Sequence, residues 1–192
     1  MTADVNGGGR LLNGLRIACW GLAAALLAAP LVAMQFTDEV NWTTFDFVFW
    51  AGMLLVACGA YEVVSRMSPN RAYRAGVGVA VVTGFLVVWA NAAVGMIGSE
   101  DNAYNLLFLA ALVAGAVGAL LSWFRPAGMA WSLYATAAIH GAVSLVALVA
   151  GWDPRGAVLA LCFVLPWLFS AGLFRHAARE TAPQAASLRQ NR

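Results

Sequence analysis

The sequence predicts an all-α, polytopic membrane protein with six transmembrane helices. Of its 192 residues, 62% are hydrophobic and only 10% are charged, whereas about 25% of a typical soluble domain is charged. The apolar residues form continuous runs of the length that a helix needs to cross a bilayer. They do not alternate with polar residues, as the strands of a membrane barrel would. This pattern excludes a disordered chain, a soluble enzyme and a nucleic-acid-binding module.

The six predicted spans follow one another with short connections. We expect Pro30 and Pro166 to kink the first and sixth spans, because proline removes a helical hydrogen bond. Residues 1–16 are expected to form a cytoplasmic N-terminal segment, 17–174 a transmembrane domain, and 175–192 a disordered cytoplasmic tail. An alternative for the first span is a cleaved signal peptide. The spans are 17–36, 45–64, 75–97, 104–124, 127–150 and 156–174.

The arginines predict the orientation of the spans. With the N-terminus inside, ten of the eleven basic residues fall on inner segments, and only Arg155 falls on an outer loop. The positive-inside rule then places both termini in the cytoplasm, with the spans in three hairpins. The outer loops hold the acids Asp38, Glu39, Glu100, Asp101 and Asp153. The inner arginines are Arg10, Arg16, Arg66, Arg71, Arg74, Arg125, Arg175, Arg179, Arg189 and Arg192.

Small residues at helical spacing predict how the spans pack. In a bilayer, helices associate through close contact of small residues and through hydrogen bonds between helices. Gly115 and Gly118 lie in such a pattern in the fourth span, and Asn91, Gly95 and Gly98 share one face of the third. We therefore expect these four glycines to be helix-packing positions.

The three cysteines, Cys19, Cys58 and Cys162, each lie inside an apolar run. They form no CxxC pair and no metal-ligand spacing. We expect them to be small buried hydrophobic residues, and we exclude a disulfide framework.

Asp46 is the first of the ionisable residues that fall within a span. Such groups are expensive in a bilayer, which makes each one a candidate for a functional site. Asp46 lies in the first turn of the second span, where its charge favours the helix N-terminus. Asn41, Thr43 or Thr44 can cap this helix. The alternative is a carboxylate in a cavity that opens to the outside.

Glu62 lies near the other end of the same span. Arg66 follows four residues later, in the order that favours an ion pair within a helix. The alternative to this cytoplasmic ion pair is a proton-coupled role for Glu62.

The densest polar stretch spans residues 91–105, between the third and fourth spans. A plain turn does not need Glu100, Asp101, Asn102 and Asn105 together. Their oxygens suit a hard cation such as Ca²⁺ or Mg²⁺, although the spacing matches no known metal loop. A solvated turn, a cation site, a docking epitope and a substrate gate all remain open.

His140 lies near the middle of the fifth span, with Thr136 and Ser144 four residues away on either side. We expect it to be hydrogen-bonded to a neighbouring helix. The only other histidine, His176, lies at the far end of the sixth span, so the two cannot clamp one haem. A haem held by one ligand or a proton relay are the alternatives.

Several stretches resemble a group of short, multi-span proteobacterial inner-membrane proteins with no assigned activity. They are NWT at 41–43, FDF at 45–47, YRA at 73–75, VGMIGSEDN at 94–102 and FRPAGMA at 124–130. The resemblance covers most of the chain from residue 40 onward. It implies a bacterial inner-membrane location and no catalytic residue, and it points to the segments around Asp46 and Glu100.

The sequence favours a non-enzymatic accessory or interaction subunit of a membrane complex. It holds no HExxH, GxSxG or P-loop motif, and we expect no cofactor. The expected partners are the lipid bilayer and either another membrane protein or a second copy, but not nucleic acid. One alternative is a solute or ion transporter in which Asp46, Asn91, Glu100 and His140 converge on a cavity. Another is a redox or lipid- or quinone-acting membrane enzyme.

Overall fold

The computed structural model describes residues 4–190, and within them every regular element is a helix. Six helical segments are long and apolar enough to cross a membrane, as the sequence predicts. They indicate a multi-pass membrane protein. Arg192 lies outside the described residues, as do the side chains of Arg10 and Arg189. The six segments are Arg16–Ala33, Thr44–Val64, Arg71–Ala93, Ala103–Leu121, Pro126–Val149 and Pro154–Ala182.

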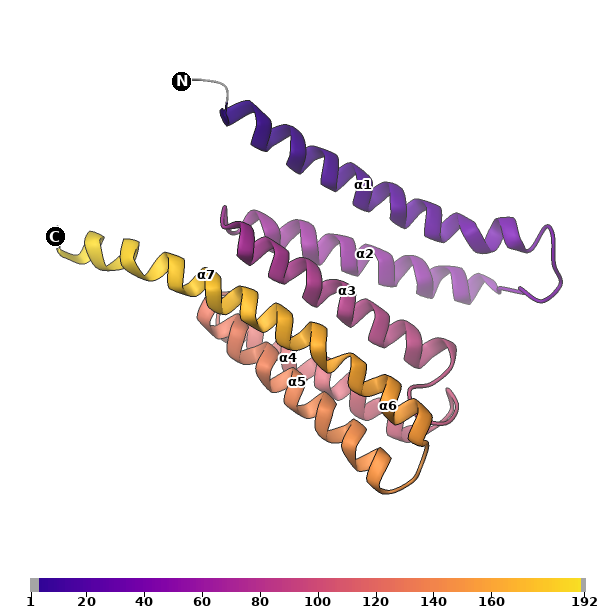
Figure 1. The fold of residues 1–192 in the computed structure, drawn as a ribbon. Coiled ribbons are helices and arrows are strands. Elements are labelled where there is room, and N and C mark those ends of the chain that lie inside the picture. Colours follow the sequence, from indigo (N-terminus) through magenta and orange to yellow (C-terminus); the bar gives the residue numbers. More distant parts are fainter. Residues whose placement is uncertain (1–3, 191–192) are drawn as a thin grey trace. The chain divides into compact units, whose positions relative to one another are not determined.

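The chain divides into two compact units, Met1–Val63 and Val64–Arg192. The first contains α1 (Asp4–Ala33) and most of α2 (Thr44–Arg66) (Figure 1). As residue numbers increase along α1, their contact partners on α2 decrease in number, so the two helices are antiparallel. These contacts are the ion pair of Arg16 with Glu62, the approach of Cys19 to Cys58, and the hydrogen bond from Trp50 Nε1 to the Leu26 carbonyl at 3.2 Å.

The second unit is a bundle built around α5 (Pro126–Val149). Helix α5 packs against α4 (Leu106–Leu121), α6 (Pro154–Cys162) and α7 (Val164–Gln190), and α7 also packs against α3 (Arg71–Ala93). A short 3₁₀ helix, η1 (Ala103–Asn105), precedes α4. Figure 1 shows α7 lying alongside α3 and α5. The core side chains with no exposed surface include Val87, Ile97, Phe108, Ala111, Ala147, Ala160 and Phe174.

Glycines on α4 bring its backbone onto α5. A Cβ added at Gly115 would overlap the Thr136 hydroxyl, and one added at Gly118 would overlap the Ser132 hydroxyl. The space that these glycines leave allows Ser132 Oγ to donate to the Gly115 carbonyl at 2.7 Å. The small residues of the fourth span therefore pack against α5 within the second unit.

Gly95 and Gly98 are not on a helix face, contrary to the prediction. Helix α3 ends at Ala93, before either glycine. Both glycines have positive φ, +74° and +72°, a backbone conformation that side chains with a Cβ disfavour. They turn the chain between α3 and η1, so a shared face with Asn91 was the wrong interpretation.

The sixth span is interrupted, and it extends further than predicted. Helix α6 ends at Cys162 and α7 begins at Val164. The break lies just before Pro166, whose missing N–H leaves the Cys162 carbonyl without its helical partner. Helix α7 then continues past Phe174 to Gln190. The segment that we expected to be a disordered tail is thus helical as far as Gln190. By contrast, α1 continues through Pro30.

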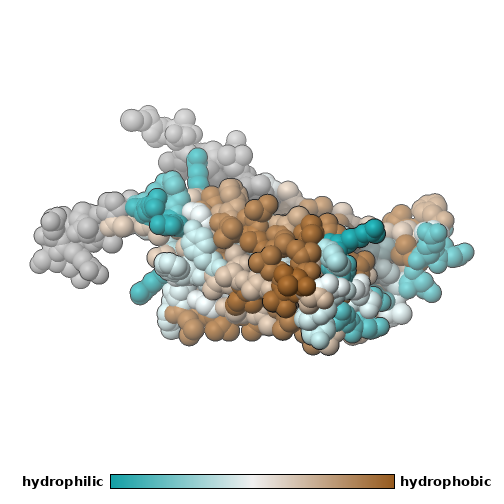
Figure 2. All heavy atoms as spheres, turned by 60° about the horizontal axis from the view of Figure 1, so that its bottom comes forward, coloured by the Kyte–Doolittle hydropathy of each residue, from teal (hydrophilic) through white to brown (hydrophobic). Residues whose placement is uncertain are grey.

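Exposed apolar side chains cover the membrane-spanning helices. Val149 is 88% exposed and Leu121 is 77% exposed. On the face shown in Figure 2, a brown apolar area lies between teal hydrophilic groups. Such a surface suits contact with lipid tails.

Candidate functional site at the 94–102 loop

Asn105 organises the loop of residues 94–102, which connects α3 to η1. Its Oδ1 accepts hydrogen bonds from the backbone N–H groups of Met96 and Ile97, at 3.0 and 2.9 Å. Its Nδ2 donates to the Ser99 carbonyl at 2.7 Å. Asn105 is buried, and so are Met96 and Ile97. One buried amide therefore satisfies backbone groups on both sides of the turn at Gly98.

Asp153 ties the 94–102 loop to the start of α6. Its Oδ1 accepts from the Gly156 N–H as the N-cap of α6, and its Oδ2 accepts from the Gly98 N–H, both at 3.0 Å. These N–H groups, first that of Gly156 and then that of Gly98, lower the pKa of the Asp153 carboxyl below its ordinary value. Because hydrogen bonds to the carboxylate favour the charged form, Asp153 is ionised at neutral pH.

Two further contacts fix the same end of the bundle. The rings of Tyr104 and Trp152 stack with their centroids 4.1 Å apart and their planes inclined by 16°. Gly156 lies so close to the Met96 carbonyl that an added Cβ would overlap it. The 94–102 loop is therefore held against the connection between α5 and α6 by side-chain, ring and backbone contacts together.

Glu100 and Asp101 occupy the tip of this fixed loop, and both are exposed. Neither forms an ion pair with any residue that the structure describes. The Asn102 Oδ1 accepts from the Tyr104 N–H at 3.1 Å, as the N-cap of η1. Within the described residues, no group of three or more His, Cys, Asp or Glu side chains could hold a metal ion. The arrangement presents two carboxylates on a fixed backbone.

Asp46 lies in the first unit and completes a capping box at the start of α2. Its Oδ2 accepts from the Thr43 N–H and from the Thr43 hydroxyl, both at 2.7 Å. The Thr43 Oγ1 in turn accepts from the Asp46 N–H at 3.4 Å. This is the reciprocal pattern that stabilises helix N-termini, and it matches the capping interpretation of Asp46.

Glu62 has a partner that the sequence interpretation did not name. It forms an ion pair with Arg16 of α1, across the two helices of the first unit. The sequence predicts Arg66, on the same helix, as its partner.

His140 is fully buried in the second unit, beside Phe108 and Phe163 at centroid distances of 4.8 and 6.0 Å. Neither ring nitrogen makes a hydrogen bond of full geometry with the described residues, although the backbone of Ala160 in the neighbouring helix α6 lies close enough to interact with the ring. The hydroxyls of Thr136 and Ser144 donate to carbonyls of their own helix, at 3.0 and 2.9 Å. Asn91 behaves similarly, because its Nδ2 donates to the Val87 carbonyl of its own helix at 2.8 Å.

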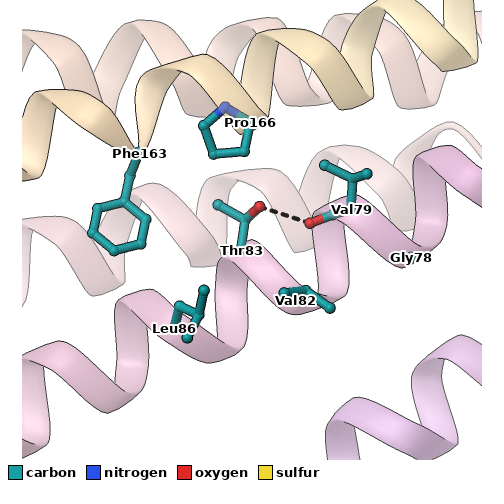
Figure 3. Close-up of a pocket in the computed structure, with 7 residues that line it drawn as sticks. All are labelled: Gly78, Val79, Val82, Thr83, Leu86, Phe163 and Pro166. Atoms are coloured by element: carbon teal, nitrogen blue, oxygen red, sulfur yellow. Dashed lines mark hydrogen bonds between the residues drawn. The ribbon is translucent and has the colours of Figure 1, made fainter. Parts of the chain in front are cut away.

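A groove lies between α3 and the start of α7. Its volume is about 320 Å³. Thr83 is the only lining side chain with a polar group, and its hydroxyl donates to the Val79 carbonyl at 2.6 Å (Figure 3). Polar groups that would orient a solute are thus absent from the described lining, and His140 is not part of it. The lining residues are Gly78, Val79, Val82, Thr83, Leu86, Phe163 and Pro166.

Two contacts, one at the 94–102 loop and one in the first unit, were not predicted from the sequence. Asp153 was counted only as an outer acid, although the pattern Asp-Pro-x-Gly at 153–156 is typical of a helix N-cap followed by proline. The approach of Cys19 to Cys58 has no local signal, because 39 residues separate them.

Comparisons of the chain with protein-family models, with curated proteins and with solved structures gave no match. The function is therefore inferred from the residues and their geometry.

Proposed function

We propose that this chain is an accessory subunit of a membrane complex in the bacterial inner membrane, with both termini in the cytoplasm. In this proposal it catalyses no reaction, and it docks on a membrane-protein partner through the 94–102 loop. The resemblance of the NWT, FDF and VGMIGSEDN stretches to proteobacterial inner-membrane proteins supports the location.

The distribution of charge supports the orientation. Arg66, Arg71, Arg74 and Arg125 flank the ends of α2 to α5 that are opposite to the 94–102 loop. The positive-inside rule assigns such ends to the cytoplasm. A reporter that folds only in the cytoplasm should therefore be active when it is fused to the C-terminus. Activity on the other side of the membrane would overturn the orientation.

The observation that carries the docking proposal is the fixed backbone beneath Glu100 and Asp101. Asn105 and Asp153 hold this loop from two sides, and the two carboxylates remain exposed. A surface that is already ordered loses less entropy when it binds. The complementary partner would present arginine or lysine on the outer face of the inner membrane.

The small-residue face of α4 is not the docking surface in this proposal. Gly115 and Gly118 already contact Thr136 and Ser132 of α5 within the same unit. A partner at this face would have to displace α5. The loop, by contrast, needs no rearrangement to be reached.

Native mass spectrometry of the full-length protein, extracted gently from its own membrane, tests the proposal. The variant Glu100→Gln/Asp101→Asn should lose a partner that the unmodified chain retains. Asp38→Asn/Glu39→Gln is the matched control, because it removes the same charges from exposed positions of another loop.

Loss of the partner in the first variant alone supports docking through the 94–102 loop. Equal retention in both variants, or equal loss, overturns it. A bare monomer that carries an unexplained small-molecule mass also overturns the accessory role and points to transport or catalysis.

A further inference from the structure

We propose that Cys19 and Cys58 form a redox-active pair, which a membrane quinone oxidises to a disulfide that links α1 to α2. This inference does not depend on the proposed docking function. It assigns a covalent modification site to the first unit.

The geometry of the two thiols carries the inference. The Sγ atoms lie 3.3 Å apart, and 39 residues of chain separate the two cysteines. A disulfide has an S–S distance of about 2.05 Å, so the sulfur atoms need to approach by only a little over 1 Å. Cys58 is 7% exposed and Cys19 is partly exposed. The pair is thus shielded from bulk water but is not sealed off.

Contacts on both sides hold the two thiols in register. The Arg16–Glu62 ion pair lies three residues before Cys19 and four after Cys58, which is one helical turn toward the helix ends. On the other side, Trp50 Nε1 donates to the Leu26 carbonyl at 3.2 Å. Neighbouring contacts of this kind oppose rotation of either helix. The sulfur atoms therefore face each other as a consequence of the α1–α2 register.

The location of the pair selects the class of oxidant. Both cysteines lie inside membrane-spanning segments, which a lipid-soluble oxidant reaches more readily than a charged, water-soluble one. A quinone dissolves in the bilayer and accepts two electrons. In the proposed step two S–H bonds break and one S–S bond forms, while the two electrons and two protons reduce the quinone to a hydroquinone. A dithiol reductant reverses the step by thiol–disulfide exchange.

The experiment uses the full chain with Cys162→Ala and a protease site inserted between Asp38 and Glu39, in the connection of α1 to α2. Cys162 lies in the other unit, and its Sγ donates to the Val158 carbonyl of its own helix. After treatment of membranes with decylubiquinone, the protein is alkylated and cleaved, and then separated without reductant. A disulfide keeps the two fragments together, and dithiothreitol separates them.

The matched control is Cys58→Ala/Gly59→Cys, in which the thiol is turned by about 100° around the helix. Within its unit a Cβ at Gly59 meets no atom within 4 Å, so this variant should fold normally. We expect the unmodified pair to cross-link at least about tenfold faster than this control, because exchange and oxidation depend on access and alignment.

Three outcomes would overturn the proposal. Equal rates for the pair and the control would show unspecific reaction of thiols. Linkage by oxidised glutathione at the rate seen with decylubiquinone would exclude a site restricted to lipid-soluble oxidants. Failure of both decylubiquinone and diamide, a permeant thiol oxidant, to link the fragments would exclude the pair itself.

Discussion

The two units of the molecule use glycine in opposite ways. In the second unit, a Cβ at Gly115 or Gly118 would overlap a side chain of α5. In the first unit, a Cβ at Gly21 or Gly59 meets no atom of that unit within 4 Å. The second unit is held by close backbone approach, and the first is held by long side chains that reach across. Similar apolar composition thus produces two kinds of helix contact.

Gly118→Leu is expected to have the largest effect, because it tests the close approach directly. The added side chain would collide with Ser132 and separate α4 from α5. Overpacking of this kind costs about 2–3 kcal/mol. Thermal unfolding in detergent should show a clear loss of stability, whereas Gly59→Leu in the first unit should show almost none. Equal losses would remove the difference between the units.

Asn105→Ala is expected to have the next largest effect. It leaves the buried N–H groups of Met96 and Ile97 without their acceptor, at a cost of about 2 kcal/mol. Asn102→Ala is the control, because it removes only the cap of η1 and should cost about 1 kcal/mol. Hydrogen exchange at Met96 and Ile97 should accelerate in the first variant only. Unchanged exchange in Asn105→Ala would contradict the role of this amide.

The hydrogen bonds of Asp153 predict a dependence on pH. Because the folded protein lowers its pKa below the ordinary value of 3.8, the stabilisation is complete above that value. It is lost as the pH falls through the lower, folded pKa. Hydrogen exchange at Gly98 should therefore accelerate in acid, and Asp153→Asn should remove that dependence. A variant that keeps the same acid response would assign it to another group.

Arg16→Gln in the first unit is expected to have the smallest effect on stability. The Arg16 side chain is 45% exposed and that of Glu62 is 16% exposed, so solvent screens the pair and its loss costs about 0.5 kcal/mol. The rate of cross-linking between Cys19 and Cys58 is a more sensitive measurement, because it reports the register of α1 and α2. Glu62→Gln should change this rate similarly. A large loss of stability in either variant would show that the first unit depends on this ion pair.

The helices were predictable because neighbouring residues along the sequence are sufficient to specify each one. A run of about 20 apolar residues specifies a membrane-spanning helix almost regardless of its neighbours, and Thr43 with Asp46 encodes the start of α2 within four residues. The end of α3 was not predictable in this way. Residues 94–97 are as apolar as the helix, and the turn is evident only in the structure, from the positive φ of Gly95 and the bonds of Asn105 to Met96 and Ile97.

The contacts of the candidate sites were less predictable, because they join distant positions. Asp153 meets Gly98 across 55 residues, and Arg16 meets Glu62 between different helices. Periodicity in one segment contains no information about which residue of another segment lies opposite. Local spacing can also mislead. Thr136 and Ser144 lie four residues from His140, as hydrogen-bond partners of its side chain would, but their hydroxyls donate to backbone carbonyls of the same helix.

The break at Phe163 divides the last span into a short helix and a long helix. Helix α6 has nine residues and α7 has 27, which at 1.5 Å per residue are about 13 Å and about 40 Å long. A rotation at the break moves the far end of α7 about three times as far as the same rotation moves the far end of α6. Because Asp153 fixes the start of α6 to the 94–102 loop, a bend at the break would displace the far end of α7 and leave that loop in place.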